Sequence, residues 1–353
     1  MPGGVTLFQV DFPSRCGSGE PRALVCFDAP QLVWLAWAMI RFISRWTPFL
    51  LAGLTSFPLL AAARPHLDGD WWPVADNPDL GDFTSPRQEP VDFAVWQAAD
   101  GTWQLWSCIR HTQCGGNTRL FHRWEVKHLT DRDWQPMGIA MQAVPELGES
   151  AGGLQAPHVI RVDGTFYMFY GDWKRICLAT SKDGKSFTRI RNERGQPDLF
   201  SGPYHNSRDP MVLKVGTLYH CYYMGHKKDA QYDSAIFVRT SPDLLDWSEP
   251  MLVSAGGVAG DQSNWYGGDA ECPFVVERDG IFHLFRNQLY GANNLNTQYA
   301  SPNPFDFGVG HDRYRTGTLP VAAPEIILHE GRYYIAALKP GLDGIRIARL
   351  RWE

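Results

Sequence analysis

Residues 207–223 have the sequence Ser-Arg-Asp-Pro-Met-Val-Leu-Lys-Val-Gly-Thr-Leu-Tyr-His-Cys-Tyr-Tyr, a polar cluster and a proline followed by two apolar runs on either side of Gly216. Two short apolar runs separated by a turn glycine are typical of an antiparallel β-hairpin. The stretch therefore predicts a pair of strands, the first of which begins at the polar cluster Ser207–Asp209.

The same order of features recurs four more times along the chain. The copies are residues 91–106, 155–170, 271–285 and 323–336, and their turn glycines are Gly101, Gly164, Gly280 and Gly331. Together with Gly216, these glycines recur at intervals of roughly 50–65 residues, which indicates a repeat architecture.

A second pattern follows three of the hairpins. It is Ala-Thr-Ser-Lys-Asp-Gly-Lys-Ser-Phe in residues 179–187, and similar sequences occupy residues 239–247 and 299–305. It predicts a third strand that ends in a polar turn, with an aromatic side chain packed back onto the sheet. Several short strands in each of five units predict an all-β fold, a five-bladed β-propeller with four-stranded antiparallel blades. A β-sandwich is the alternative, but it does not explain five aligned glycine–aromatic hairpins.

The composition is that of a soluble globular protein. The 353 residues are 44% hydrophobic and 20% charged, with a net charge of −5. Because binding to nucleic acid requires a basic face, the negative charge argues against a nucleic-acid partner. Aromatic residues make up 13% of the chain, and in a propeller much of this share serves to pack the blades.

The N-terminal region differs from the rest of the chain. Residues 39–63 contain a basic start with Arg41 and Arg45, an apolar run over 49–60 and three alanines, which is the pattern of a signal peptide. We therefore expect translation to begin at Met39, with residues 1–38 an over-extended N-terminus, and the mature protein to be periplasmic or secreted, with no membrane association. An N-terminal membrane anchor that includes residues 32–38 is the alternative, although the two arginines interrupt such a span. Residues 64–90 are interpreted as a lead-in segment and 91–353 as the propeller, whose oligomeric state the sequence does not determine.

Cleavage after residue 63 leaves five cysteines, Cys108, Cys114, Cys177, Cys221 and Cys272. An odd number means that at least one thiol is free within the chain. Cys108 and Cys114 flank a short loop and are candidates for a disulfide in an oxidising compartment, whereas the others lie on predicted strands as buried thiols. Cysteine and histidine spacing indicates no zinc site, and no metal ligands are predicted.

Three acidic residues occupy the starts of inner strands in three different repeats. They are Asp92, Asp209 and Glu271. Since the inner strands of a propeller all begin at one face around a central axis, we expect these carboxylates to converge there. Glycoside hydrolysis needs one carboxylic acid to protonate the leaving oxygen and one carboxylate to activate water or attack. The sequence therefore predicts a site for cleaving a glycosidic bond.

Other polar and aromatic residues at the same strand ends are candidates for binding the sugar. Arg208 is expected to pair with Asp209 or to contact substrate, and Trp173 and Trp265 to stack on a sugar ring, although Trp173 could instead pack within a blade. The remaining candidates are Gln155, His158, Asn287 and Glu325. His158 and Glu325 occupy equivalent positions, one residue after the proline of their repeats.

The acids also carry a resemblance to a known family. Asp92, Asp209-Pro210 and Glu271-x-Pro273 resemble the three-acid pattern of family 43 glycoside hydrolases, the five-bladed arabinosidase and xylosidase group, over roughly residues 85–352. The resemblance implies that Asp92 is the general base of an inverting reaction, that Asp209 tunes pKa values and orientation, and that Glu271 is the general acid. It also implies a structural Ca²⁺ at the propeller axis, although no cofactor is required for the reaction.

Two alternatives remain open at this stage. Arg208-Asp209-Pro210 and Glu271-Cys272 are similar to the Arg-Asp-Pro and Glu-Cys motifs of family 32 fructosidases, which implies a retaining reaction. The Asn-Asp-Pro-Asn-Gly nucleophile motif of that family is absent, and Asp92 is followed by Phe93. A propeller that binds carbohydrate without cleaving it is the second alternative, because a fold does not fix a function. The sugar and the linkage are not determined by the sequence.

Overall fold

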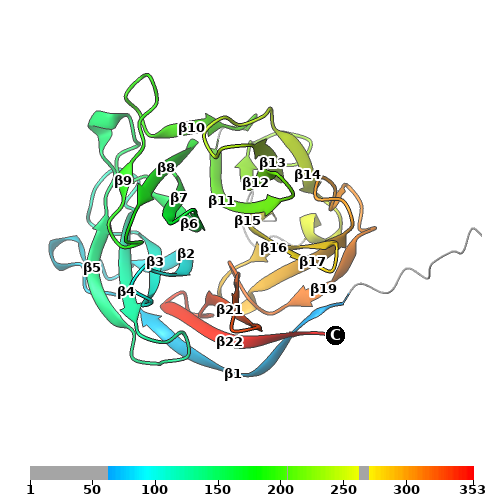
Figure 1. The fold of residues 1–353 in the computed structure, drawn as a ribbon, viewed down its shortest axis with the longest axis horizontal. Helices are drawn as coiled ribbons and strands as arrows, with labels where there is room; N and C mark the ends of the chain where they lie inside the picture. Colours follow the sequence, from blue (N-terminus) through cyan, green and yellow to red (C-terminus); the bar gives the residue numbers. More distant parts are fainter. Residues whose placement is uncertain (1–62, 205, 262–269) are drawn as a thin grey trace, which may run out of the picture. The chain divides into compact units, whose positions relative to one another are not determined.

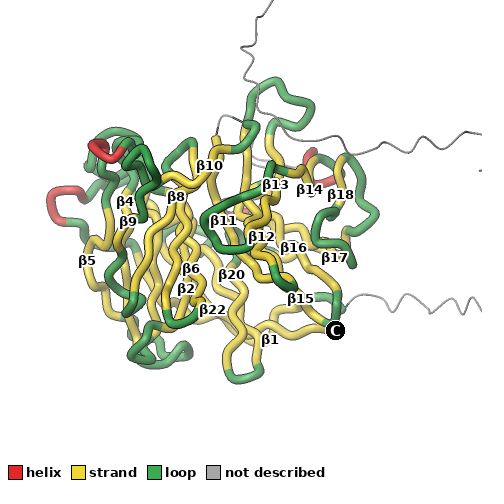
Figure 2. The backbone as a smooth tube through the Cα atoms, turned by 45° about the horizontal axis from the view of Figure 1, so that its top comes forward, coloured by secondary structure: helices red, strands yellow, loops and turns green. Residues whose placement is uncertain are grey.

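The computed structural model describes residues 63–204, 206–261 and 270–353. The proposed over-extended N-terminus and signal peptide lie outside the described residues, as does Trp265. The described part of the chain is built from strands and connecting loops, with short helical turns only (Figure 2). None of its helices is long and apolar enough to cross a membrane.

The strands form five sheets arranged around a central axis (Figure 1), which confirms the predicted five-bladed propeller. Blade 1 contains β2 (Glu89–Gln97), β3 (Trp103–Arg110), β4 (Leu120–Val126) and β5 (Gln135–Met141). Blade 2 contains β6 (Gln155–Val162), β7 (Thr165–Gly171), β8 (Arg175–Ser181) and β10 (Asp198–Ser201), with β9 (Thr188–Arg189) also paired to β8. Blade 3 contains β11 (Asn206–Val215), β12 (Leu218–His226), β13 (Ser234–Ser241), β14 (Met251–Ala255) and the short β18 (Gly308–Val309).

The last two blades complete the ring. Blade 4 contains β15 (Glu271–Arg278), β16 (Ile281–Leu289), β17 (Leu295–Ser301) and β19 (Arg315–Leu319). Blade 5 contains β20 (Glu325–His329), β21 (Arg332–Leu338), β22 (Gly344–Trp352) and β1 (Pro65–Asp76). Neighbouring strands are antiparallel except for β14 and β18, which pair in parallel.

The segment before the first blade closes the ring. Strand β1, which lies within the segment interpreted from sequence as a lead-in, pairs with β22 from Pro65 opposite Trp352 to Asp76 opposite Gly344. It is the outer strand of blade 5, so the first and last strands of the described chain lie side by side (Figure 1). This pairing satisfies the backbone groups of β22 that would otherwise form an open sheet edge.

The turn glycines occupy the inner hairpins as predicted. All five, from Gly101 to Gly331, have positive φ, and in three hairpins the preceding residue is also left-handed, as at Asp163, Asp279 and Glu330. Two consecutive residues with positive φ are required by the turns whose twist matches that of a two-stranded hairpin. The sequence therefore fixes the inner strand pair of each blade locally.

The aromatic side chains of the second repeat pattern pack onto the preceding blade, whereas the sequence predicts that they pack back onto their own sheet. Phe187 contacts Trp106 with ring centroids 5.3 Å apart, and Trp247 contacts Phe169 at 5.9 Å. Trp106 and Phe169 are almost completely buried between the sheets. These contacts form the packing between neighbouring blades and hold the inner strands in fixed positions around the axis.

Candidate active site

Each inner strand begins with a backbone irregularity. The pairing register shifts between Val91 and Phe93, Gln155 and His158, Arg208 and Met211, and Glu271 and Phe274. Each of these four bulges contains one non-glycine residue with positive φ. Blade 5 has a residue with the same backbone conformation just before β20. The five bulge residues are Asp92 (34°), Ala156 (41°), Asp209 (56°), Cys272 (42°) and Ala323 (47°).

The local sequence accounts for the bulges. In four blades the bulge residue is followed by a proline, which has no N–H for the sheet ladder and therefore suits an interrupted register. A bulge adds one residue to its strand and redirects a side chain. As a result the five bulge residues meet at the axis, where they line a cavity of about 20 Å³. Strained backbone of this kind is common at functional sites.

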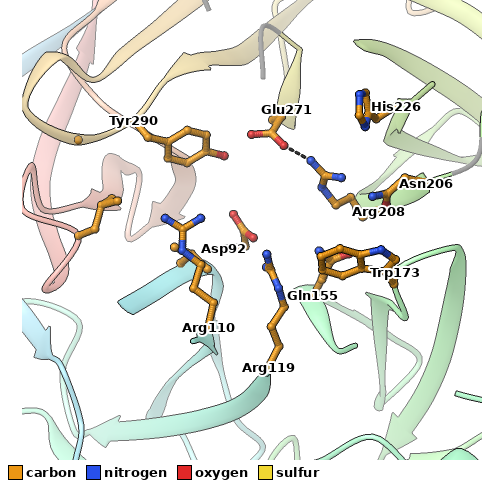
Figure 3. A pocket seen from close by; sticks show the side chains of 13 residues that line it. Asp92, Arg110, Arg119, Gln155, Trp173, Asn206, Arg208, His226, Glu271 and Tyr290 are labelled. Atoms are coloured by element: carbon orange, nitrogen blue, oxygen red, sulfur yellow. Dashed lines mark hydrogen bonds and ion pairs between the residues drawn. The ribbon is translucent and has the colours of Figure 1, made fainter. Parts of the chain in front are cut away.

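A larger pocket of about 560 Å³ opens above this small cavity (Figure 3). The residues that line it are Val91, Asp92, Arg110, Arg119, Gln155, Trp173, Asn206, Arg208, His226, Glu271, Tyr290, Gly291 and Leu342. Its volume is within the range of sites for small ligands. The pocket includes five of the sequence-predicted site residues: Asp92, Gln155, Trp173, Arg208 and Glu271.

Arg208 links two of the three acids. Its Nη2 forms an ion pair with Oε1 of Glu271, and its Nε lies 3.7 Å from Oδ1 of Asp209. The backbone N–H of Cys272 donates a hydrogen bond to Oδ2 of Asp209 at 3.1 Å. Arg208, Asp209 and Glu271 are at most 7% exposed. Asp209 lies beneath the pocket, in the lining of the small cavity, whereas Glu271 reaches the pocket itself.

Burial changes the acidity of these groups. It raises the pKa of Glu271 to about 7, with further raising by the charges of Asp209 and Asp92, against the opposing effect of Arg208. Burial likewise raises the pKa of Asp209 to about 6, again against the effect of Arg208. A carboxyl group that keeps its proton near neutral pH can serve as a general acid.

Cys272 lines the small cavity at the axis and contacts two of the three acids. Its Sγ lies 3.3 Å from Oδ1 of Asp92, 3.7 Å from Oδ2 of Asp209 and 3.2 Å from the hydroxyl oxygen of Tyr290. Burial and the neighbouring carboxylates raise the pKa of this thiol well above its usual range. The thiol therefore stays protonated and donates to a carboxylate, which differs from the simple packing role predicted from sequence.

Three predicted substrate contacts lie elsewhere. His158 and Glu325 line a cavity of about 520 Å³ further along the axis, on strands β6 and β20 beyond the bulges. Asn287 on β16 is fully buried, and its Oδ1 accepts a hydrogen bond from the backbone N–H of Ala323 at 3.1 Å. Glu325 also lines the small cavity beside Asp92 and Asp209, but neither His158 nor Glu325 lines the pocket, because both follow the bulge residues of their blades. Asn287 instead ties blade 4 to the start of blade 5.

The pocket also contains residues that were not among the sequence-predicted site residues. They are Arg110, Arg119, Asn206, His226 and Tyr290, together with the apolar or backbone contacts of Val91, Gly291 and Leu342. Arg110 and His226 end the second strands β3 and β12, so the topology of the repeats points to them. Arg119 precedes β4 and Tyr290 follows β16 by one residue, outside both repeated patterns, and the sequence carries no signal for them.

The candidate disulfide is not formed. Cys108 and Cys114 are both free thiols, as are Cys177, Cys221 and Cys272. Cys108 is buried on β3, and its Sγ donates to the carbonyl of Leu154 at 3.3 Å, whereas Cys114 lies in the following loop with its Sγ 3.5 Å from the carbonyl of Arg119. The two thiols are thus engaged by different backbone groups.

The calcium ion implied by the resemblance does not fit the axial residues. Beyond the bulges, the lining of the axial cavity includes the carboxyl groups of Glu325 and the exposed Glu277, the imidazole of His158, and apolar side chains such as Met211 and Phe274. Ca²⁺ requires six to eight oxygen ligands, and two carboxylates among such neighbours do not supply them. Among residues 63–204, 206–261 and 270–353, no group of three or more His, Cys, Asp or Glu side chains is placed to hold a metal ion.

Comparisons with known proteins support the fold. No protein-family model matches the chain, and no curated protein matches its sequence. A thermostable family-43 glycoside hydrolase has a similar structure, with a TM-score of 0.55 and 19% identity over 76% of this chain and 92% of that chain. A family-43 β-xylosidase/α-arabinofuranosidase from a compost microbial metagenome, in a calcium-free complex with xylotriose, has a TM-score of 0.54 and 16% identity over 78% and 95%.

A third similar structure is an α-L-arabinofuranosidase from Clostridium thermocellum, with a TM-score of 0.51 and 16% identity over 76% of this chain and 91% of that one. The three proteins have low sequence identity to this chain, so the similarity establishes a common architecture and leaves the chemistry to be argued from the site. What the chain shares with these family 43 structures is the five-bladed β-propeller.

Proposed function

We propose that the chain is a glycoside hydrolase that cleaves a glycosidic bond of an oligo- or polysaccharide by acid/base catalysis with inversion. One observation carries the proposal: carboxylates from blades 1, 3 and 4 meet at a single pocket, with Asp92 and Glu271 lining it and Asp209 directly beneath. A binding module needs no such set of acids, whereas hydrolysis of a glycoside needs two carboxyl groups on either side of one bond.

Glu271 is assigned as the general acid. Its raised pKa of about 7 keeps a large fraction of the group protonated at neutral pH, so that it can donate to the glycosidic oxygen. After donation the new carboxylate lies next to the guanidinium of Arg208. Arg208 therefore stabilises the charge that develops on the acid during bond cleavage.

Asp92 is assigned as the general base. Its blade is not adjacent to that of Glu271 in the ring, and the two side chains point into the same space (Figure 3). In an inverting reaction Asp92 takes a proton from water as the water attacks the anomeric carbon, while Glu271 gives its proton to the leaving group. Asp209, in the lining of the small cavity, contributes its negative charge to the raised pKa of Glu271.

The experiment is hydrolysis of aryl arabinofuranoside, xyloside, galactoside and fructan substrates by the purified chain, with the product anomer followed by proton NMR. We expect Glu271→Gln to lower turnover by a factor of about 10² to 10⁴ on substrates whose leaving group needs protonation. Glu277→Gln is the control, since Glu277 is an exposed acid on the same strand β15. Formation of the inverted anomer supports Asp92 as base, and the retained anomer assigns it as nucleophile, as in the fructosidase-like alternative.

Binding of carbohydrate without turnover on any glycoside, including the charged ones introduced below, would contradict the proposal and favour the non-catalytic propeller. Family 43 proteins of similar fold are solved with xylotriose, which supports a carbohydrate as the ligand of this pocket in either case. Removal of Glu271 then separates the two functions, because a hydrolase loses turnover but keeps its affinity for sugar.

We also propose that the chain is exported to the periplasm or secreted. The support is the signal-peptide pattern of residues 39–63, which contain the basic start, the apolar run and the small residues before Arg64. N-terminal sequencing of the protein recovered from its cells should give a mature end close to Arg64. A mature protein that retains residues 39–63 would contradict export by cleavage.

A further inference from the structure

We propose that the sugar bound in this pocket carries an anionic group, a carboxylate or a sulfate ester, and that Arg119 binds it. The inference rests on the proposed function, since it names the substrate class of the same site. It starts from the charge of the pocket: three arginines, Arg110, Arg119 and Arg208, line it together with the acids, although the chain as a whole has a net charge of −5.

Two of the three arginines already have carboxylate partners. Arg208 is shared between Glu271 and Asp209, and Nη2 of Arg110 lies 2.6 Å from Oε2 of Glu89. For Arg119 the contacts among the described residues are the ring of Trp173, 5.0 Å from Cζ, and Sγ of Cys108, 3.9 Å from Nη1. Within that part of the chain, no carboxylate lies at ion-pair distance from Arg119.

The backbone of Arg119 is held in place by the neighbouring blade. Its N–H donates to the carbonyl of Gly152 at 2.9 Å, and Arg119 forms a parallel bridge with Gly153. The loop before it is fixed as well, because Asn117 donates to Ala151 at 2.8 Å and a Cβ at Gly152 would collide with the carbonyl of Gly115. Such close packing of two loops positions the guanidinium before any ligand arrives, which reduces the entropy lost on binding.

The contact with Trp173 leaves the donors of Arg119 available. A guanidinium that lies over an aromatic ring makes this contact with its face, so the N–H groups in its plane other than the one that Nη1 directs to Sγ of Cys108 remain available to a ligand. Trp173 has φ of 83°, an unusual backbone conformation for a tryptophan. Figure 3 shows Arg119 extending into the pocket from below Asp92, with Trp173 beside it.

The chemistry of this arrangement favours an anion over a neutral sugar. A planar guanidinium matches a carboxylate or sulfate with two parallel hydrogen bonds. A pocket with three acids and no compensation would repel a charged sugar, whereas here Arg208 and Arg110 are paired with acids and Arg119 faces the space that a substrate fills. A neutral sugar would leave Arg119 without a directly paired carboxylate, although its charge also acts on Asp209 from a longer distance.

The test is calorimetric titration of the full chain with D-glucuronate and D-galacturonate, with D-galactose 6-sulfate, and with the neutral sugars D-glucose and D-galactose. We expect one of the anions to bind at least about tenfold more tightly than its neutral counterpart, and added salt to weaken this preference. The uronates and the sulfate ester distinguish the two kinds of anion.

Three variants make the result specific. Arg119→Leu should reduce affinity for the preferred anion about 10- to 100-fold and leave affinity for neutral sugars unchanged. Arg119→Lys should reduce it less, because lysine keeps the positive charge but lacks the two parallel N–H donors of the guanidinium. The control is Arg161→Leu, since Arg161 also lies over an aromatic ring, 5.1 Å from Phe166, but is exposed and outside the pocket. Equal affinity for charged and neutral sugars, or an Arg119→Leu protein that binds the anion as the unmodified chain does, would overturn the inference.

Turnover of the matching aryl uronides and sulfated glycosides separates this inference from the proposed function. Anion binding that depends on Arg119, without turnover of any charged or neutral glycoside, would refute hydrolysis and leave the anion site standing. Turnover of neutral glycosides with no preference for the charged ones would support hydrolysis and refute the anion site.

Discussion

The thiol of Cys272 lies 3.3 Å from Oδ1 of Asp92, although the two residues are 180 positions apart in the chain and belong to blades 1 and 4. Both are bulge residues with positive φ. The contact shows how narrow the propeller is at its axis, where the first residues of non-adjacent blades touch each other. It also gives the proposed base a hydrogen-bond donor that no local sequence pattern supplies.

Replacing Cys272 should therefore affect the function of Asp92. Cys272→Ala removes the donor, and we expect kcat to fall about tenfold with little change in KM, since a hydrogen bond to a charged group is worth about 1.5–3 kcal/mol. Cys272→Ser keeps a donor and should restore most of the activity. Steady-state kinetics across pH are the measurement, with Cys114→Ala, a half-exposed free thiol, as control. Equal losses in the Ala and Ser variants would indicate packing alone.

The proposed acid predicts the alkaline side of the pH profile. Because Glu271 has a pKa of about 7 and is active when protonated, kcat/KM should decline as pH rises through about 7. Glu271→Gln should lower kcat by a factor of about 10² to 10⁴ on substrates with poor leaving groups. A dinitrophenyl glycoside, whose leaving group departs as a stable anion and needs no protonation, should be affected much less. A profile that stays flat to pH 9 would contradict this role for Glu271.

The free energy of unfolding should depend on the protonation of Glu271. The folded pKa of Glu271 exceeds the unfolded value of 4.5, so the folded state binds more protons between pH 4.5 and 7, and stability falls as pH rises through this window. The contribution is at most about 3 kcal/mol. Chemical denaturation at pH 4.5 and pH 8 measures how much the free energy of unfolding falls between these two pH values. The fall should be larger for the unmodified chain than for Glu271→Gln, whose side chain does not titrate. Identical losses would argue against a raised pKa.

Asp209 is expected to act through Glu271. Its negative charge raises the pKa of Glu271, so Asp209→Asn should move the alkaline limb of the kcat/KM profile to lower pH. The same substitution should reduce kcat, because a smaller fraction of Glu271 is then protonated at pH 7. A purely structural role for Asp209 would lower activity at every pH and leave the position of the limb unchanged, so the pH profile is the measurement that decides.

Glu325 should influence stability and leave catalysis intact. Burial raises its pKa well above the ordinary value, so the charged form is disfavoured in the fold. The folded pKa exceeds the unfolded one, and stability is lost as pH rises above the unfolded value of 4.5. Glu325→Gln should therefore raise the thermal midpoint at pH 8, have little effect at pH 4, and leave kcat unchanged. A large loss of kcat in a folded variant would place Glu325 in the reaction.

The closure of the ring should be equally testable. Trp72 on β1 is 8% exposed and contacts Tyr334 of blade 5 edge-on, with ring centroids 6.4 Å apart. Trp72→Ala should destabilise the fold by about 3 kcal/mol, as expected for truncation of a buried tryptophan. Chemical denaturation measures the change in the free energy of unfolding. Trp71→Ala, on the same strand but at a less buried position, should reduce this free energy by a smaller amount. Equal effects would mean that β1 does not close the ring through Trp72.

Much of the fold could be predicted from the sequence because its signals are local. The turn glycines mark the inner hairpins, and the prolines after Ala156, Asp209, Cys272 and Ala323 mark the starts of four of the five inner strands. Backbone sterics act within two or three residues, so these positions can be predicted without knowledge of distant contacts. The repeat brings together the strand starts that carry Asp92, Asp209 and Glu271.

The sequence by itself determined the repeat, the number of blades and the placement of three acids at one end of the inner strands. Only the tertiary structure decided that Asp92 occupies the same bulge position as Cys272, so that Glu271 lies one residue earlier in its strand. It also decided which side chains line the pocket: Arg119 and Tyr290 do, whereas His158 and Glu325 do not. The physical reason is that a bulge adds a residue to its strand and redirects side chains without altering the pattern of residue types. The loops that carry Arg119 and Tyr290 are positioned by contacts with other parts of the propeller, which no local pattern encodes.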